Sequence, residues 1–102
     1  MSITRVNAFK AKEGRADALA EYLESIVLLI ESADDCLYRH LLRGHDDPSH
    51  FLIIETWESI AAHQLSVQGI DKKEFLRAMQ MLAEDPQAEY FTSWPPTASF
   101  DS

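Results

Sequence analysis

The chain has 102 residues, of which 46% are hydrophobic and 25% are charged, and its formal net charge is −8. This composition is typical of a single globular domain over residues 1–102 and excludes a disordered chain. Basic residues are few and scattered, which argues against binding to nucleic acid or to an anionic membrane.

Hydrophobic periodicity predicts a strand, a helix and two further strands in the first part of the chain. The first strand covers residues 3–9 and is followed by a helix over residues 15–32, where apolar positions recur every three or four residues. A strand over residues 36–43 leads through a turn rich in Gly, Asp and Pro to a strand over residues 51–57. The turn composition is typical of a connection between antiparallel strands.

The second part of the chain predicts a broken helical region and one more strand. A short helix begins at Ser59 and ends at Gly69, and a second helix begins at Asp71, since Ser and Asp are preferred N-cap residues. A fourth strand is expected over residues 89–94, and residues from about 95 onward are expected to form a loose tail.

The element order β-α-β-β-α-β is that of the ferredoxin-like α+β fold, with an antiparallel four-stranded sheet and helices on one face. Right-handed crossovers place the first and third strands at the centre. The face away from the helices is expected to carry a set of apolar side chains too large to leave in water. A second subunit stacking its own sheet there would cover them, so we expect a homodimer. The set comprises Phe9, Phe51, Ile53 and Trp57.

Features of the sequence that bear on location agree with a cytoplasmic protein. The longest apolar run, residues 26–30, is far shorter than the roughly 20 residues of a membrane-spanning helix. The first residues lack the apolar segment of a signal peptide. The single cysteine, Cys36, excludes an intrachain disulfide and a thiolate-rich metal site.

Several short segments carry a resemblance to a known family: Phe9-Lys10-Ala11-Lys12-Glu13-Gly14, Cys36-Leu37, Asp46-Asp47-Pro48, Glu55-Thr56-Trp57-Glu58-Ser59 and Ala62-His63. With these segments the chain resembles, over about residues 3–94, the antibiotic-biosynthesis monooxygenase (ABM) domain family of dimeric α+β barrels. The resemblance implies one of several roles. Members oxygenate phenolic or quinol polycycles without metal or organic cofactor, degrade haem, isomerise a phosphorylated sugar, or have no known reaction.

Two of these roles fit the sequence poorly. Asn7 stands where haem-degrading members carry an Asn on the first strand, but those members also need a Trp and a His in the second helical region. Residues 64–79 contain neither. The isomerase members tend to carry a second His in that region, and the chain also lacks a basic cluster for a phosphate.

Two residues are candidate catalytic groups. His63 is a candidate general base because imidazole titrates near neutral pH, or else a helix-capping or hydrogen-bonded structural histidine. Asn7 is a candidate hydrogen-bond donor that stabilises a substrate phenolate, or else a polar residue satisfied by backbone or water at the mouth of the barrel.

Six residues are candidates for substrate binding. Trp57 could form an aromatic wall, or could anchor the core or the dimer interface. Glu55 could act as a base if burial raises its pKa, or could pair with Arg5 on the neighbouring strand. The six are Arg5, Phe9, Phe51, Glu55, Trp57 and Phe75.

The expected function is that of a cofactor-independent monooxygenase for a small phenolic or quinol-type aromatic substrate. No metal, flavin or haem is expected, because the sequence has no metal-ligand pattern, phosphate-binding loop or dinucleotide fingerprint. The alternatives are a non-catalytic dimeric binding or accessory protein, and an isomerase or cyclase on the same scaffold. Convergence of Asn7, Trp57 and His63 would favour an enzyme, whereas a pocket filled by Phe9, Phe51 and Trp57 would favour a binding or structural role.

Overall fold

The computed structural model describes residues 2–95, so the expected tail beyond residue 95 lies outside the described residues. The predicted order of strands and helices is confirmed, and the second helical region contains two helices joined by a short 3-10 turn. In chain order the elements are β1 (Ile3–Lys10), α1 (Ala16–Glu31), β2 (Cys36–Arg43), β3 (His50–Trp57), α2 (Ile60–Ser66), η1 (Val67–Gly69), α3 (Lys72–Met79) and β4 (Gln87–Phe91).

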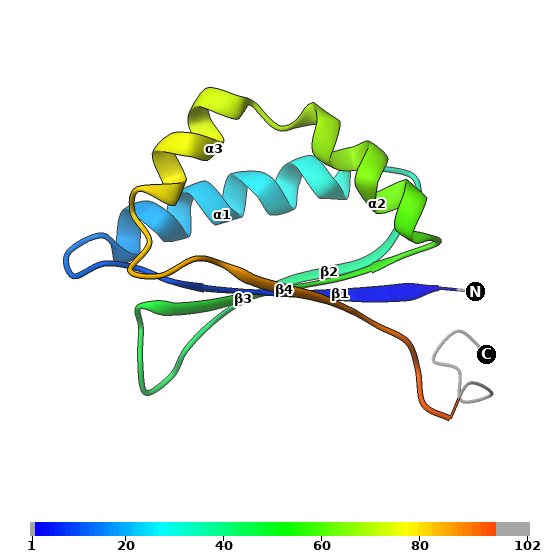
Figure 1. The fold of residues 1–102 in the computed structure, drawn as a ribbon, viewed down its shortest axis with the longest axis horizontal. Helices are drawn as coiled ribbons and strands as arrows, with labels where there is room; N and C mark the ends of the chain where they lie inside the picture. Colours follow the sequence, from blue (N-terminus) through cyan, green and yellow to red (C-terminus); the bar gives the residue numbers. More distant parts are fainter. Residues whose placement is uncertain (1, 96–102) are drawn as a thin grey trace.

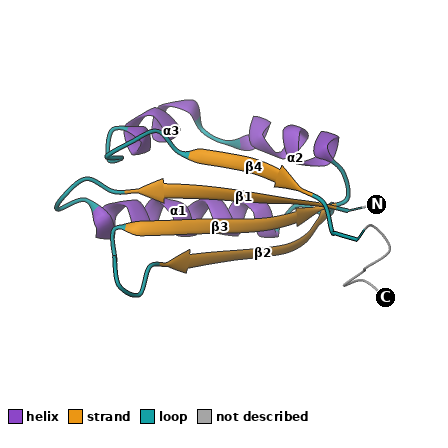
Figure 2. Ribbon diagram, turned by 60° about the horizontal axis from the view of Figure 1, so that its bottom comes forward, coloured by secondary structure: helices purple, strands orange, loops and turns teal. Residues whose placement is uncertain are grey.

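The four strands form one antiparallel sheet in the order β2-β3-β1-β4, with the first and third strands of the chain at its centre, as predicted (Figure 2). All the helices lie on one face of this sheet, and the other face is bare (Figure 1). The ferredoxin-like α+β fold is therefore confirmed. Within residues 2–95, no helix combines the length and the apolar character that crossing a membrane requires.

The broken helical region forms an arch on the same face of the sheet as α1 (Figure 1) and lies beside α1, near β4 (Figure 2). Its two helices begin at the predicted N-caps, because each cap side chain accepts hydrogen bonds from backbone N–H groups that the first turn leaves free. Ser59 Oγ accepts from the N–H of Ala62 at 3.0 Å, and Asp71 Oδ1 accepts from those of Lys73 and Glu74 at 2.9 and 3.1 Å. The helical region is interrupted after Gly69, at the end of η1, as predicted.

The last strand begins and ends earlier than its sequence indicates. It pairs with β1 from Gln87, opposite Ala8, to Phe91, opposite Thr4, instead of covering residues 89–94. Trp94 lies past the end of β4 and is largely exposed. The strand boundaries follow the length of β1 that is available for pairing, and not the β-propensity of the strand's own residues.

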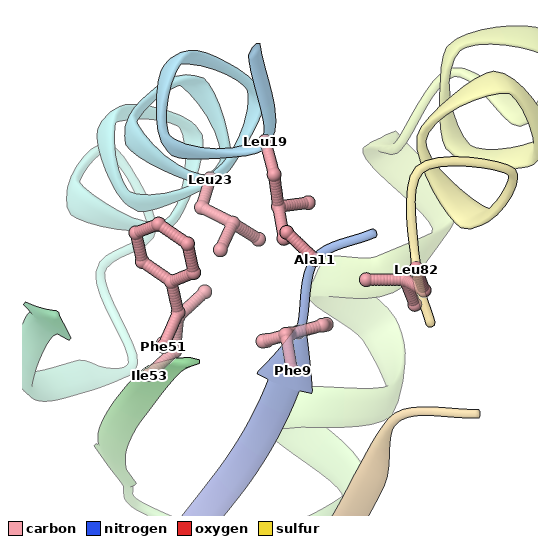
Figure 3. Packing of buried hydrophobic residues seen from close by; sticks show 7 residues of the cluster. All are labelled: Phe9, Ala11, Leu19, Leu23, Phe51, Ile53 and Leu82. Atoms are coloured by element: carbon pink, nitrogen blue, oxygen red, sulfur yellow. The ribbon is translucent and has the colours of Figure 1, made fainter. Parts of the chain in front are cut away.

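The side chains of Phe9, Phe51, Ile53 and Trp57 were expected on the bare face of the sheet, and this expectation is wrong. All four are buried within the single chain, on the face that the helices cover. Phe9, Phe51 and Ile53 belong to the core cluster with Leu19 and Leu23 of α1 (Figure 3). The helix-covered side offers the larger apolar contact area, so the bulkier of the two alternating sets faces that side.

The bare face carries the other alternating set of residues, which is also largely apolar. In the central strands, Val6 lies opposite Ile54 and Ala8 opposite Leu52, and all four are half-buried. Leu42 on β2, opposite Leu52, is exposed on this face. This second set, and not the core residues, is therefore the apolar surface that a partner subunit would cover.

Candidate functional site

A cavity of about 540 Å³ lies between α1, the arch of α2, η1 and α3, and the helix-covered face of the sheet. Its wall is mostly apolar, with side chains from every one of these elements. The apolar part of the wall includes Leu23, Ile26, Ile30, Val67, Ile70 and Met79.

The cavity brings together six of the eight site residues predicted from the sequence: Arg5, Asn7, Phe9, Glu55, His63 and Phe75. The other two, Phe51 and Trp57, are fully buried and do not line the cavity. Asn7 and His63 thus line the same cavity, while Trp57 acts on it only through the polar groups that it contacts. The three aromatic residues expected to fill a purely structural pocket leave this cavity open.

Glu55 is a buried carboxyl group on the floor of the cavity, and its two oxygens have different neighbours. The indole N–H of Trp57 donates to Oε1 at 2.7 Å, and Arg5 Nη1 lies 3.8 Å from Oε2, so the expected cross-strand ion pair is present. Burial raises the pKa of Glu55, while the Trp57 hydrogen bond and the positive charge of Arg5 oppose that rise. Glu55 is therefore a stronger base than an exposed carboxylate.

His63 lies on α2 with its imidazole ring held between two aromatic rings. The ring centroids of Trp57 and Tyr90 lie 5.6 and 5.5 Å from that of His63. Nδ1 is hydrogen-bonded to the Tyr90 hydroxyl at 2.6 Å, and Nε2 lies 3.9 Å from Glu55 Oε1. Burial, and secondarily the charge of Arg5, lowers the pKa of His63 to about 4, so the imidazole is neutral at physiological pH.

Two polar groups on the cavity wall have no partner among the described residues. Asn7 Oδ1 and the Tyr22 hydroxyl are both buried without a hydrogen bond, and both residues line the cavity. An unpaired buried polar atom costs about 1–3 kcal/mol, so a ligand or water that hydrogen-bonds to it is favoured. The arrangement is typical of a site that recognises a mainly apolar molecule through a few polar atoms.

Two residues of the site, Tyr22 and Tyr90, were missed from the sequence. A hydroxyl group within the apolar stripe of the first helix was a usable signal for Tyr22, since such a group requires a partner. Tyr90 gave no local signal, because it lies 27 residues from His63 and meets it only through the pairing of β4 with β1.

Among residues 2–95, no three His, Cys, Asp or Glu side chains come together in an arrangement that could hold a metal ion. In the turn between β2 and β3, His45 Nδ1 lies 3.2 Å from Asp46 Oδ1, and both side chains are fully exposed.

Residues 2–82 match the family model described as antibiotic biosynthesis monooxygenase (ABM), and the chain therefore belongs to this family. Membership supports a monooxygenase-type function. No curated protein matches the sequence.

Solved structures share the fold over most of the chain. One, described as an antibiotic biosynthesis monooxygenase, has a TM-score of 0.82 at 18% identity and covers 91% of this chain and 99% of its own. A protein from Shewanella oneidensis has a TM-score of 0.78 at 26% identity, covering 88% of both chains. One from Pseudomonas aeruginosa has a TM-score of 0.79 at 23% identity, covering 88% of this chain and 91% of its own.

Proposed function

We propose that the chain is a monooxygenase that oxidises a small phenolic or quinol-type molecule without a metal or organic cofactor. The observation that carries the proposal is the cavity, in which apolar walls surround a buried carboxyl group, a neutral imidazole and an unpaired amide oxygen. Apolar walls suit an aromatic ring, and the polar groups suit its hydroxyl. Family membership supports the reaction type, and the substrate class is our inference.

The proposed reaction uses the substrate as its only source of electrons. The hydroxyl loses its proton to a group of the cavity, and the electron-rich anion passes one electron to dioxygen. The resulting radical pair combines by forming a C–O bond, and the peroxide then takes up a proton. Loss of water leaves a carbonyl at the oxidised carbon, so one atom of dioxygen enters the product and the other leaves as water. A cavity with apolar walls keeps bulk water from the radical pair.

The proposed roles follow from the positions of the polar groups on the wall. The proton passes to the buried pair formed by Glu55 and His63, whose facing atoms lie 3.9 Å apart. Asn7 contacts the reacting hydroxyl, because its amide can accept from the O–H group and donate to the anion that follows. Phe9 and Phe75 belong to the apolar wall that holds the ring.

We also propose that two copies form a homodimer through the bare face of the sheet. Val6, Ala8, Leu52 and Ile54 form a continuous apolar centre on that face, since each lies opposite another member of the set. A contiguous apolar surface of this kind favours a protein partner, and a second copy supplies the same surface by two-fold symmetry.

The test is oxygen uptake with a panel of polycyclic phenols and quinols, in a chelating buffer without added cofactor. We expect uptake with at least one compound and a product one oxygen atom richer. Asn7→Ala is expected to lower turnover about 100-fold or more, because it removes the group that meets the anion. The matched control is His45→Ala, which changes a fully exposed side chain.

Two outcomes of this test would contradict the proposal. Compounds that bind in the cavity without oxygen uptake would indicate a binding or accessory protein. A product with the same mass as its substrate would indicate an isomerase or cyclase.

A further inference from the structure

We propose that Tyr90 is a positioning residue that donates its hydroxyl proton to His63 Nδ1 and so keeps the His63 proton on Nε2. His63 then offers the cavity a hydrogen-bond donor, and Glu55 is the proton acceptor. The tautomer is a property of the chain alone. The catalytic consequence rests on the proposed monooxygenase function.

The geometry assigns the two ring nitrogens to different surroundings. Nδ1 lies 2.6 Å from the Tyr90 hydroxyl, which does not line the cavity, and Nε2 points to Glu55, which does. The imidazole is held between the rings of Trp57 and Tyr90, and its side chain is only 8% exposed. These contacts keep the two nitrogens from exchanging places.

A neutral imidazole has one N–H and one lone pair, and a tyrosine hydroxyl can satisfy either of them. The group facing Nε2 therefore decides the tautomer. The Glu55 carboxylate attracts an N–H and repels a lone pair, which places the proton on Nε2 and leaves Nδ1 to accept from Tyr90.

The charges around Glu55 support its ionised form in the resting protein. The Trp57 N–H on β3 and Arg5 on β1 both stabilise the carboxylate. On β2, Arg39 lies opposite Glu55 in the register, but its guanidinium is paired with Glu31 at 3.1 Å. From α2 the facing group is the neutral imidazole of His63, whose other ring nitrogen is bonded to the Tyr90 hydroxyl of β4.

The roles of the two titratable groups follow from this arrangement. The O–H bond of the substrate breaks and an O–H bond forms on Glu55, most directly on Oε2, because Oε1 already accepts from Trp57. His63 Nε2–H donates to the substrate oxygen as negative charge develops on it. The lowered pKa of His63 suits a neutral donor better than a base, and the raised pKa of Glu55 suits a proton acceptor.

The first experiment needs no substrate: nitrogen-15 NMR of the four histidines at neutral pH, with the His63 signals assigned from their loss in His63→Gln. We expect the Nε2–H tautomer, and a proton on Nδ1 would overturn the proposal. Tyr90→Phe is expected to raise the pKa of His63, because a donor to Nδ1 stabilises the neutral ring. If the pKa falls or stays unchanged, Tyr90 is not the donor. Tyr38→Phe, which changes an exposed tyrosine, is the matched control.

The second experiment uses a compound that the enzyme oxidises. We expect Glu55→Gln to lower kcat by about 100- to 10,000-fold, the usual contribution of a general base. His63→Gln is expected to retain more activity than His63→Ala, because the glutamine amide still offers a donor. Equal and severe losses in both His63 variants, with Glu55→Gln active, would make His63 the base and overturn the assignment. Absence of oxygen uptake with every compound would contradict the proposed function. The tautomer measured by NMR does not depend on that activity and would remain valid.

Discussion

Burial of the His63 imidazole makes the stability of the fold depend on pH between about 4 and 6.5. The pKa of His63 is about 4 in the folded protein, compared with 6.5 for an ordinary histidine. Between these values the unfolded chain binds a proton that the folded chain excludes. The free energy of unfolding therefore rises with pH through this window and is fully present above pH 6.5.

The magnitude follows from the difference between the two pKa values. Each pH unit of difference corresponds to about 1.4 kcal/mol, so His63 alone should remove about 3 kcal/mol of stability by pH 4. The imidazole is 8% exposed, so solvent screens this effect little. Glu55 acts with the opposite sign: its raised pKa means that the folded chain keeps a proton that the unfolded chain has lost, and stability decreases as pH rises.

The assay compares urea unfolding of the wild type and His63→Gln from pH 7.5 to pH 4. The Glu55 contribution is present in both proteins and largely cancels in their difference, which isolates the imidazole. Dilute protein is needed because the isoelectric point near 4.8 lies inside this range. We expect the wild type to lose about 3 kcal/mol relative to the variant between neutral pH and pH 4.

His45→Gln provides the matched control, since it removes a fully exposed imidazole from the same chain. It should follow the wild-type pH profile. If the wild type and His63→Gln lose stability in parallel, the imidazole titrates in the folded protein as it does in water. Burial beside Trp57 and Tyr90 would then not be what sets the protonation of His63.

Three further predictions concern the fold and its assembly. In a urea titration, Leu19→Ala is expected to lower the free energy of unfolding by about 2–5 kcal/mol, because Leu19 is 0% exposed in the core. The control Leu65→Ala changes a side chain that is 70% exposed and should alter this free energy by less than about 0.5 kcal/mol. Asp71→Ala removes the cap of α3 and should cost about 1 kcal/mol, and an unchanged urea midpoint would show that this cap does not stabilise the arch. By light scattering, Ile54→Glu on the bare face should be a monomer of 11.6 kDa, and the control Leu65→Glu should remain a dimer. A monomeric wild type at micromolar concentration would contradict the proposed interface.

Local features of the fold were predictable because each depends on residues close together in the sequence. Alternation along residues 51–57 correctly grouped Phe51, Ile53 and Trp57 on one face, since successive strand side chains point in opposite directions. The caps at Ser59 and Asp71 were also recognisable, because a cap bonds to backbone two or three residues away. The cross-strand pairing of Arg5 with Glu55 followed once the two central strands were known.

The candidate site was predictable in its residues and less so in its arrangement. Six of the eight expected side chains line one cavity, but Phe51 and Trp57 lie beneath its wall. The depth of a side chain below a cavity depends on the packing of α1 and the arch, which no single segment encodes. The same holds for Tyr90, whose contact with His63 joins two distant segments.

The sequence by itself determined the order of elements, the two alternating sets of each central strand and the residues able to carry chemistry, because these depend on local periodicity and side-chain type. Only the tertiary structure decided which set the helices cover, because both sets are apolar and the choice depends on the whole chain packing against the sheet. It also decided the protonation of the site. The carboxyl group of Glu55 and the imidazole of His63 depart from their ordinary pKa values only when folding removes them from water.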